Sequence, residues 1–578
     1  MSLIRASLSK AYMPFKLPAV GFTAGVVTLA AIAVAAGLLT SPPGLPGGGA
    51  PGAAVSDDDG KKDPGAKEQT GPIHVDRFGQ VAGVTFSGKV AGEASLKGDT
   101  QPDDAYYGSL KAPGWDAYGG LKGSSETYGL KATGYYHIEA LQNRKVMVTP
   151  AGTLYFSLGV NGLTANDTYT QLKGQEDRFE WMPPYEGEYR SAFLNSKDTF
   201  SFYVANRIRK TGQPYSSREF YEESISRIRK WGFNSAGGWS PANYAQEFKV
   251  PHFPFLPLSE IPEAQVDGLK IFDIFAEGAE AKIDALFAKN LPQNKDNPYI
   301  VGYFLGNESD YHLIINELPK LKGSQAPSKR KLVELLKSRY GSIDRFNTAW
   351  KTEYNGFDAL YEASLPLSST QARSDMDDFM KLYLDTYYGT VERVFRKYDP
   401  NHLLLGDRWL TTPSNHPKIR GMLAEAAGKY MDVISINHYA RQLDREMLRD
   451  VYDKSGGRPI LLTEFGYGTR EQGLTAPLLA SDEEQRAQLY RSYVEEAASL
   501  GYVVGTHWFS YLDQPATGRW FEGPSGESYN FGLLNVTDRP YKTFLSGVME
   551  THKNIYSILL GKQAPYEAPF LAAEAKGK

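Results

Sequence analysis

The sequence predicts an α/β protein whose main domain is a (β/α)8 TIM barrel. The first observation is a set of eight short apolar runs, rich in aliphatic and aromatic residues, as is typical of parallel strands buried on both faces. The second is that segments with helical spacing of apolar residues separate the runs. The runs occupy residues 154–160, 233–239, 252–258, 299–306, 402–409, 432–439, 459–465 and 503–511.

The segments between the runs carry the signals of amphipathic helices. Phe220, Ile225 and Ile228 recur at helical spacing, and Ser481 with Glu484 forms a capping box before another such segment. An added helical excursion at 332–350 separates the fourth and fifth runs. We therefore expect the barrel over residues 150–562, followed by a C-terminal tail at 563–578. In such a barrel the functional site lies at the C-terminal ends of the strands.

Residues 1–40 are predicted to be a membrane anchor. Arg5, Lys10 and Lys16 precede an uncharged stretch at 17–39, which has about the ~20 residues needed to cross a bilayer. The basic flank places the N-terminus in the cytoplasm and the rest of the chain outside the inner membrane, in the cell envelope. A cleaved signal peptide on a secreted protein is the alternative, because Ala and Gly dominate the stretch. Residues 41–72, rich in Pro, Gly and charge, are predicted to be a disordered linker.

Composition limits the classes of function. The chain has 63 basic and 67 acidic residues and a net charge of -4, which gives no support for a nucleic-acid partner. It has no cysteine, which excludes disulfides, thiolate nucleophiles and cysteine zinc sites. The nine histidines include no HExxH spacing. No metal or cofactor is predicted, although a site built only of Asp and Glu stays open.

Two glutamates stand where strands are predicted to end. Glu308 follows Asn307 after the fourth run, and Glu464 lies at the end of the seventh run. Burying a carboxylate is costly, and two that converge are what glycoside hydrolysis requires. An isolated strand-end glutamate is more often a salt-bridge partner, and Asn-Glu also occurs at 316–317, outside any run. The argument therefore depends on the matched positions in units four and seven.

With these positions, the chain resembles the clan A retaining glycoside hydrolases, whose catalytic glutamates end strands four and seven, the first preceded by Asn. Within that clan it is similar to the family 50 β-agarases, in the segments 134–139, 160–162, 231–240, 340–350 and 508–513. The resemblance covers roughly residues 128–544. It implies hydrolysis of β-glycosidic bonds in an extracellular polysaccharide, with β-agarase or β-galactosidase-like activity.

The same resemblance implies roles for individual residues. Glu308 would be the general acid/base and Glu464 the nucleophile. Asn307 would bind the sugar 2-hydroxyl, Tyr439 would orient the nucleophile, and Trp508 would offer a flat face under the sugar ring. A charged Glu464 near Glu308 would help to keep Glu308 protonated near neutral pH.

Four further residues are candidates of second rank, each with an equally weighted structural interpretation. Hydrogen bonding at the barrel rim or packing in the interior explains them as well as substrate binding does. They are Asn161, Trp239, His438 and Arg408.

Several alternatives remain open at this level. A transglycosylase would use the same residues and deliver the sugar to a second sugar, and a non-catalytic barrel would bind glycan at the cell surface. A structural envelope protein would explain the anchor but not the strand-end residues.

Residues 73–149, rich in Gly and Tyr, are predicted to be a β-rich accessory domain, either a carbohydrate-binding sandwich or a segment packed against the barrel. The predicted partners are a polysaccharide or oligosaccharide and, through the N-terminal segment, the membrane.

Overall fold

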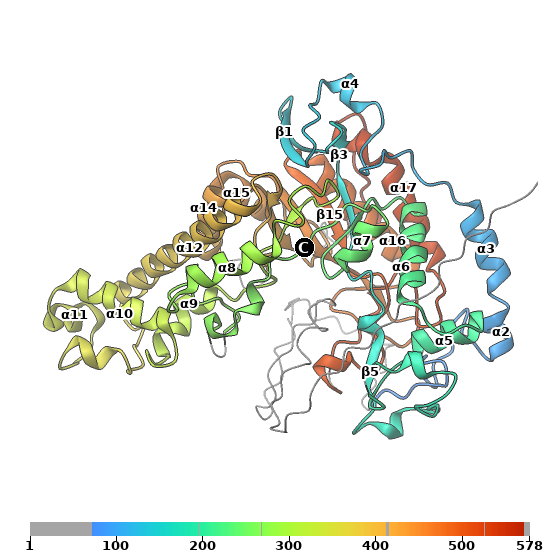
Figure 1. Cartoon of the computed structure of the whole chain (residues 1–578), viewed down its shortest axis with the longest axis horizontal. Coiled ribbons are helices and arrows are strands. Elements are labelled where there is room, and N and C mark those ends of the chain that lie inside the picture. The colour runs from blue at the N-terminus through green and yellow to red at the C-terminus, as the bar shows by residue number, and fades with distance from the viewer. Residues whose placement is uncertain (1–71, 195, 267–268, 412–415, 525, 572–578) are drawn as a thin grey trace, which may run out of the picture. The chain divides into compact units, whose positions relative to one another are not determined.

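The computed structural model describes residues 72–571, except for 195, 267–268, 412–415 and 525 (Figure 1). The predicted anchor at 1–40 and the predicted linker up to residue 71 lie outside the described residues. Within the described residues, none of the helices combines the length and the apolar character needed to cross a membrane.

Parallel strands form the centre of the described part. Six of them pair in one sheet in the order β10-β11-β12-β15-β4-β7. Strand β8 (Gly302–Tyr303) pairs in parallel with β9 (Leu403–Leu404) in a separate ladder. The six-stranded sheet consists of β4 (Ser157–Val160), β7 (Ser235–Ala236), β10 (Trp409–Leu410), β11 (Ile434–Asn437), β12 (Ile460–Phe465) and β15 (Val503–Trp508).

Single bridges join the two ladders into a closed circuit. His252 pairs in parallel with Ala236 at the end of β7 and with Ile300, just before β8. On the other side, Ser435 N of β11 donates to Leu405 O, between β9 and β10. Each of the eight apolar runs thus contributes one parallel segment to the circuit. The prediction of an α/β fold is confirmed.

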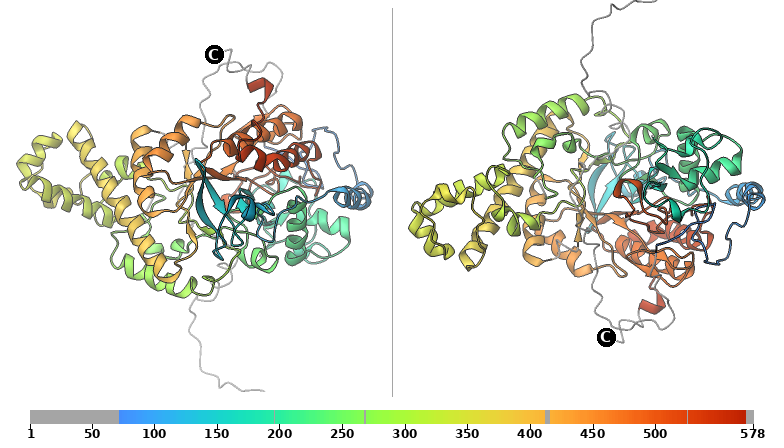
Figure 2. Two further views of the ribbon diagram at one scale, coloured as in Figure 1. Left: turned by 90° about the horizontal axis from the view of Figure 1, so that it is seen from above. Right: turned by 90° about the horizontal axis from the view of Figure 1, so that it is seen from below.

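Helices lie outside the strands and separate them along the chain, as Figures 1 and 2 show. Apolar faces on these helices cover the strands and form one large buried core. In the described part of the chain, the α-helices with assigned bounds after β4 are α5 (Phe202–Thr211), α6 (Ser217–Lys230), α7 (Ala242–Glu247), α8 (Ala279–Asn290), α9 (His312–Asn316), α10 (Pro327–Tyr340), α11 (Ile343–Trp350), α12 (Thr370–Tyr398), α14 (Pro417–Tyr430), α15 (Arg445–Lys454), α16 (Glu483–Ser499) and α17 (Lys542–Leu559).

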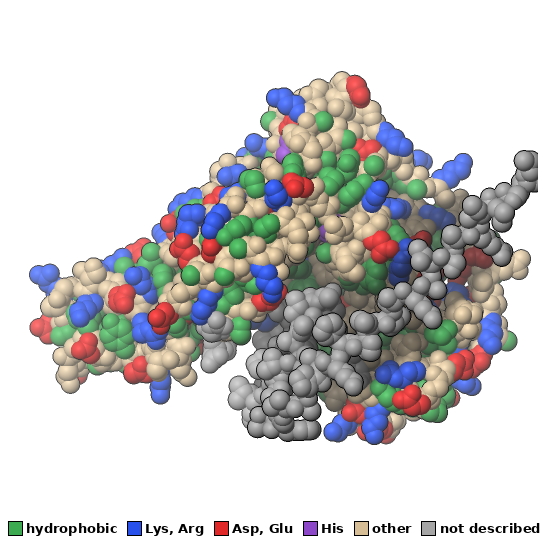
Figure 3. Space-filling model, viewed as in Figure 1, with side chains coloured by type: hydrophobic (Ala, Val, Ile, Leu, Met, Phe, Trp, Pro, Cys, Tyr) green, Lys and Arg blue, Asp and Glu red, His purple; other side chains and the backbone are tan. Residues whose placement is uncertain are grey.

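The helical excursion between β8 and β9 packs on the long helix α12, at the end far from the strands (Figure 1). Asp375 of α12 explains its cohesion, because this buried carboxylate accepts hydrogen bonds from Tyr340 OH at 2.6 Å and Trp350 Nε1 at 2.7 Å. Residues 340–350, one of the agarase-like segments, therefore have a structural role here. Figure 3 shows acidic and basic side chains interspersed over these helices, so the surface has no single sign of charge there.

Residues 73–149 differ from the predicted β-rich domain. Before residue 137 the described chain forms the short helices α2 (Glu93–Lys97), α3 (Thr100–Ser109) and α4 (Ser124–Tyr128), joined by turns. The reason is local, because Asp76 and Asp116 each accept two backbone N–H groups and so close tight turns within the Gly-rich segments. Only β1 (His137–Leu141) and β2 (Arg144–Val148) are strands, in an antiparallel sheet completed by β3 (Leu154–Tyr155).

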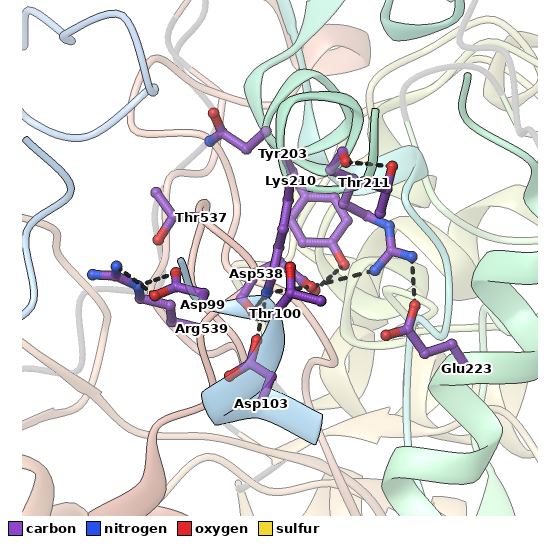
Figure 4. A network of polar contacts seen from close by, with 12 residues as sticks. Asp99, Thr100, Asp103, Tyr203, Lys210, Thr211, Glu223, Thr537, Asp538 and Arg539 are labelled. Atoms are coloured by element: carbon purple, nitrogen blue, oxygen red, sulfur yellow. Dashed lines mark hydrogen bonds and ion pairs between the residues drawn. The ribbon is translucent and has the colours of Figure 1, made fainter. Parts of the chain in front are cut away.

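A buried ion cluster fastens this N-terminal segment to α5 and α6 (Figure 4). Asp103 of α3 lies 2.5 Å from Lys210 Nζ. Lys210 also approaches Asp538, whose carboxylate accepts from Tyr203 OH at 2.8 Å and Arg227 Nη1 at 2.7 Å. Burial opposes ionisation of Asp538, but the charges of Arg227, Arg207 and Lys210 outweigh it and hold the pKa of Asp538 well below its usual range.

Candidate active site

The two glutamates flank one asparagine. Asn437 of β11 pairs in register with Glu464 of β12. The Asn437 side chain reaches the other way, toward the loop after β8, where its Nδ2 donates to Glu308 Oε1 at 2.9 Å. Glu308 and Glu464 come from strands that are more than 150 positions apart in the sequence, and the circuit of parallel strands brings them to the same end.

Three donors hold the carboxylate of Glu464. Its Oε1 accepts from Arg408 Nη2 at 2.5 Å and from Trp239 Nε1 at 3.2 Å, and its Oε2 accepts from Tyr439 OH at 2.9 Å. The residue is only 5% exposed, so these partners replace water around the charge. The three donors come from three different strand ends and fix the position of the carboxylate.

Arg408 is sealed inside the site. It has no exposed surface, and its Nη2 also donates to Thr463 O at 3.1 Å. The guanidinium carbon lies 5.1 to 5.5 Å from the ring centroids of three aromatic side chains. These rings exclude water and leave Glu464 as the single carboxylate that Arg408 contacts among the described residues. They belong to Trp239, Phe255 and Phe304.

Two glycines after β7 make room for this arrangement. A Cβ on Gly238 would lie 2.4 Å from Arg408 Nη1, and a Cβ on Gly237 would lie 2.6 Å from Asn161 Oδ1. Trp239, Glu308 and Arg408 all have positive φ, at 64°, 54° and 53°. They are three of the seven non-glycine residues with positive φ in the described part of the chain. Since each such residue costs of order 1–3 kcal/mol, backbone strain is concentrated at this site.

Glu308 is poised between its two protonation states near neutral pH. Burial and the charge of Glu464 raise the pKa of Glu308 to about 7, against the hydrogen bond from Asn437 and the charges of Arg408 and Lys270. Its backbone N donates to Asp407 O at 3.2 Å, which ties the loop to the fifth strand segment. A carboxyl group of this kind can both give and take a proton at pH 7.

Asn307 and Tyr439 contact this pair directly or through Asn437. Asn307 Oδ1 accepts from Asn437 Nδ2 at 3.1 Å, and no described residue accepts from its own amide N–H groups. Burial and the charges of Glu464 and Glu308 raise the pKa of Tyr439 well above its usual range. Tyr439 therefore stays a neutral donor to Glu464 across the physiological pH range.

Two of the four second-rank candidates, Trp239 and Arg408, contact Glu464, and the other two do not. Asn161, directly after β4, donates from Nδ2 to Thr463 O at 2.8 Å and so supports β12, although β15 lies between the two strands in the sheet. The imidazole of His438 lies 3.1 Å from Thr411 Oγ1, and its Nε2 accepts from Asp444 N at 3.3 Å. Burial lowers the pKa of His438 to about 4, so its ring is neutral.

The position of Trp508 does not agree with the predicted sugar platform. The preceding side chain, His507, points into the interior of the circuit of strands, where it contacts Ser157 Oγ at 2.9 Å. Because side chains alternate along a strand, Trp508 points outward to the helices. There its ring lies 5.7 Å from Tyr490 of α16 and 5.0 Å from Phe544 of α17, and it has no exposed surface.

The sequence interpretation missed several residues of the site. Asn437 precedes His438 at the end of the sixth run, so the strand-end argument itself contained the signal for it. Phe509 and Phe531 form a cluster against which Trp239 and Tyr439 pack. Phe531 comes from a loop after the eighth strand, and no sequence pattern marks it.

An arginine from the loop after β15 pairs with two carboxylates whose pKa values are affected by the charge of Glu464. Arg519 pairs with Glu527 at 2.7 Å and lies 4.0 Å from Asp167, which follows β4. Burial raises the pKa of Asp167, the charge of Arg519 lowers it, and the charges of Glu522 and Glu464 raise it further. Among the described residues, no group of three or more His, Asp or Glu side chains is arranged to hold a metal ion.

Comparisons with known proteins show similarity in sequence and in fold. No protein-family model matches the chain. Beta-agarase B of Vibrio sp. (strain JT0107) is 28% identical over 544 residues, which cover 84% of this chain and 54% of that protein. Beta-agarase A of the same strain is 27% identical over 537 residues, covering 83% and 52%. The chain spans about half the length of these curated relatives.

Solved structures extend the likeness to the fold. The structure of an exo-beta-agarase has a TM-score of 0.72 with 25% identity and covers 87% of this chain and 75% of its own. That of the agarase AgWH50C has a TM-score of 0.71 with 24% identity, covering 84% and 74%. PfGH50B has a TM-score of 0.71 with 26% identity, covering 84% and 75%. In sequence and in fold, this chain is similar to the family 50 β-agarases.

Proposed function

We propose that this chain is a retaining glycoside hydrolase that cleaves β-glycosidic bonds of a polysaccharide, with Glu464 as nucleophile and Glu308 as acid/base. One observation carries the proposal. A charged glutamate held by three donors lies beside a second glutamate whose pKa is raised to about 7. Double displacement needs one carboxylate that stays ionised and another that holds a proton. The closed circuit of parallel strands, taken as a (β/α)8 barrel, supports the same assignment.

In the first step, Glu308 gives its proton to the glycosidic oxygen as the bond from this oxygen to C1 breaks. A carboxylate oxygen of Glu464 bonds to C1, and a covalent glycosyl-enzyme forms. Oε2 of Glu464 is the better placed oxygen, because it has one donor whereas Oε1 has two. Arg408 and Trp239 keep the carboxylate in place while its charge moves into the new bond.

In the second step, the charge on Glu464 has gone, so the pKa of Glu308 falls and Glu308 stays ionised. Glu308 then takes a proton from water as the water oxygen bonds to C1, and the bond from C1 to Glu464 breaks. The anomeric configuration is retained after two inversions. Asn307 is proposed to donate from its free amide group to the 2-hydroxyl of the sugar.

Agar-type galactan is the proposed substrate, because the similar proteins are named beta-agarases. The polymer is too large to enter a cell, and the basic residues before the apolar stretch at 17–39 support a site of action outside the inner membrane. A panel of polysaccharides, tested with the full chain and with Glu308→Gln, identifies the substrate from the products. Products formed with and without an added acceptor sugar separate hydrolysis from transglycosylation. Retained binding with no turnover on any polymer would instead support a glycan-binding barrel.

Azide rescue tests the two roles separately. In Glu464→Gly, azide can occupy the place of the nucleophile, so an activated aryl β-glycoside should yield the α-glycosyl azide. In Glu308→Ala, azide should attack the glycosyl-enzyme and yield the β-glycosyl azide. Glu317→Gln is the matched control, since Glu317 belongs to the other Asn-Glu pair and its carboxylate is 42% exposed beside Lys320. Wild-type turnover in Glu464→Gly, or exchanged anomers, would refute the assignment.

A further inference from the structure

The amide of Asn437 makes three hydrogen bonds inside the site. Its Nδ2 donates to Glu308 Oε1 at 2.9 Å and to Asn307 Oδ1 at 3.1 Å. Its Oδ1 accepts from Thr463 Oγ1 at 2.7 Å. The residue has no exposed surface, so water does not compete for these bonds.

Chemistry fixes the orientation of this amide. An ionised Glu308 and the Oδ1 of Asn307 only accept hydrogen bonds, so Asn437 must turn its NH2 group toward both of them. The hydroxyl of Thr463 can donate to the remaining oxygen of Asn437. The amide therefore has one arrangement in which all of its polar atoms are satisfied.

A local irregularity in the sheet brings Thr463 and Glu464 together around Asn437. In the pairing of β11 with β12, Ile436 is opposite Leu462, but the next residue, Asn437, is opposite Glu464. The register skips Thr463. Because such an irregularity re-aims side chains, the Thr463 hydroxyl reaches the amide of Asn437, which stands in register with Glu464.

The contact has a consequence for the acid form of Glu308. Oε1 accepts the N–H of Asn437. In a neutral carboxylic acid the carbonyl oxygen is a better acceptor than the hydroxyl oxygen, so this bond favours Oε1 as the carbonyl oxygen and Oε2 as the oxygen that carries the proton. The same Asn437 group occupies Oδ1 of Asn307, which leaves the NH2 of Asn307 for a sugar oxygen.

We propose that Asn437 is a positioning residue that selects Oε2 of Glu308 as the oxygen that delivers the proton and sets the orientation of Asn307. This inference rests on the proposed function. In the first step the proton passes from Oε2 to the glycosidic oxygen, the bond from that oxygen to C1 breaks, and Glu464 bonds to C1. The electron pair left on Glu308 spreads onto Oε1, where the N–H of Asn437 stabilises it. In the second step Oε2 takes the proton of the attacking water.

Leaving-group dependence tests this role. An oligosaccharide needs acid assistance for its leaving group, whereas a 2,4-dinitrophenyl β-glycoside of the same sugar does not. Asn437→Ala should lower kcat/KM on the oligosaccharide by about 100-fold, the lower end of what general acid catalysis contributes. On the dinitrophenyl substrate, the rate of the first step should change by less than about 3-fold, since misdirecting the acid leaves that step intact. Equal losses on both substrates would overturn the proposal.

The pH profile supplies a second readout. The hydrogen bond from Asn437 lowers the pKa of Glu308. Asn437→Ala removes this bond, so the pKa of Glu308 should rise and the basic limb of kcat/KM should move to higher pH. A basic limb that stays where it is in the wild type would also overturn the proposal. Thr463→Val should shift both readouts in the same direction by a smaller amount, and Thr463→Ser, which keeps the hydroxyl, should restore them.

Two controls separate the possible failures. Asn234→Ala removes another buried asparagine, which bonds to Gly119 O and Phe156 O away from the glutamates. It should lower stability without changing the ratio of the rates on the two substrates. Glu308→Ala gives the full loss of acid assistance. If Glu308→Ala itself shows no leaving-group dependence, the proposed function fails; if it does and Asn437→Ala does not, only the role of Asn437 fails.

Discussion

Arg408 and Glu464 form a buried ion pair, with Nη2 and Oε1 2.5 Å apart and three aromatic rings around the guanidinium. The guanidinium places a positive charge in contact with a carboxylate that has little access to water. The pair also makes the site sensitive to changes that do not touch a substrate, because each charge depends on the other.

Arg408→Met should destabilise the protein and remove activity together. It leaves the charge of Glu464 buried without its counter-ion, for which we expect a loss of about 3–5 kcal/mol in the free energy of unfolding. Urea unfolding and kcat measured on the same sample check this. The control is Arg449→Met, which breaks the surface pair with Asp453, where both side chains are more than half exposed and the loss should stay below about 1 kcal/mol. A variant of Arg408 with unchanged stability would contradict the role of the pair.

Replacement by phenylalanine should lower activity at one tryptophan, Trp239, and stability at another, Trp508. Trp239→Phe removes the indole N–H that Glu464 Oε1 accepts, and a hydrogen bond to a charged group contributes about 1.5–3 kcal/mol, so kcat/KM should fall roughly 10- to 150-fold. Trp508→Phe removes the bond from Nε1 to Phe531 O and leaves a small cavity beside Tyr490 and Phe544. We expect it to lower the free energy of unfolding by about 1–3 kcal/mol with little change in KM. A large rise in KM in Trp508→Phe would restore the idea of a sugar platform.

Glu308→Gln should be more stable than the wild type at high pH, and the difference in the free energy of unfolding should grow as the pH rises. The folded state holds the pKa of Glu308 at about 7, above the ordinary value of 4.5, so the folded state binds the proton more tightly than the unfolded state. The favourable contribution of the protonated group is complete below pH 4.5 and is lost as the pH rises through about 7. The neutral amide avoids that loss. Thermal unfolding from pH 4 to pH 8 should show a growing advantage for Glu308→Gln, and Glu317→Gln should show none.

Asp538→Asn should destabilise the junction between the N-terminal segment and the helices α5 and α6. Arg207, Lys210 and Arg227 would lose their buried counter-charge, and we expect a loss of about 3–5 kcal/mol at pH 7. Because the folded pKa of Asp538 is depressed, its contribution is present above the unfolded value and is lost as the pH falls through the folded value. The gap to wild type should therefore shrink in acid. Asp453→Asn, on a surface pair, should change stability by less than about 1 kcal/mol at both pH values.

Much of the fold class followed from local patterns. Eight apolar runs separated by amphipathic segments correspond to eight parallel segments in one circuit. The N-terminal region does not form the predicted β-rich domain. Asp76 and Asp116 accept backbone N–H groups and close turns within Gly-rich stretches. Composition alone does not distinguish such turns from the ends of strands. The structure brings Glu308, Glu464, Asn307, Tyr439, Trp239 and Arg408 together, while Asn161 and His438 support the strands around them.

The sequence by itself determined the apolar runs, the helical segments between them and the polar residues at their ends, since these depend on periodicity and side-chain chemistry. Only the tertiary structure decided which way each strand-end residue faces. Trp508 and His507 are neighbours, yet Trp508 packs on helices and His507 points into the interior of the circuit of strands. A shift of one residue in the register of this strand would exchange their positions. The register that skips Thr463 likewise sets Asn437 between the two glutamates. These placements depend on the register in which distant strands pair, and local sequence does not encode that register.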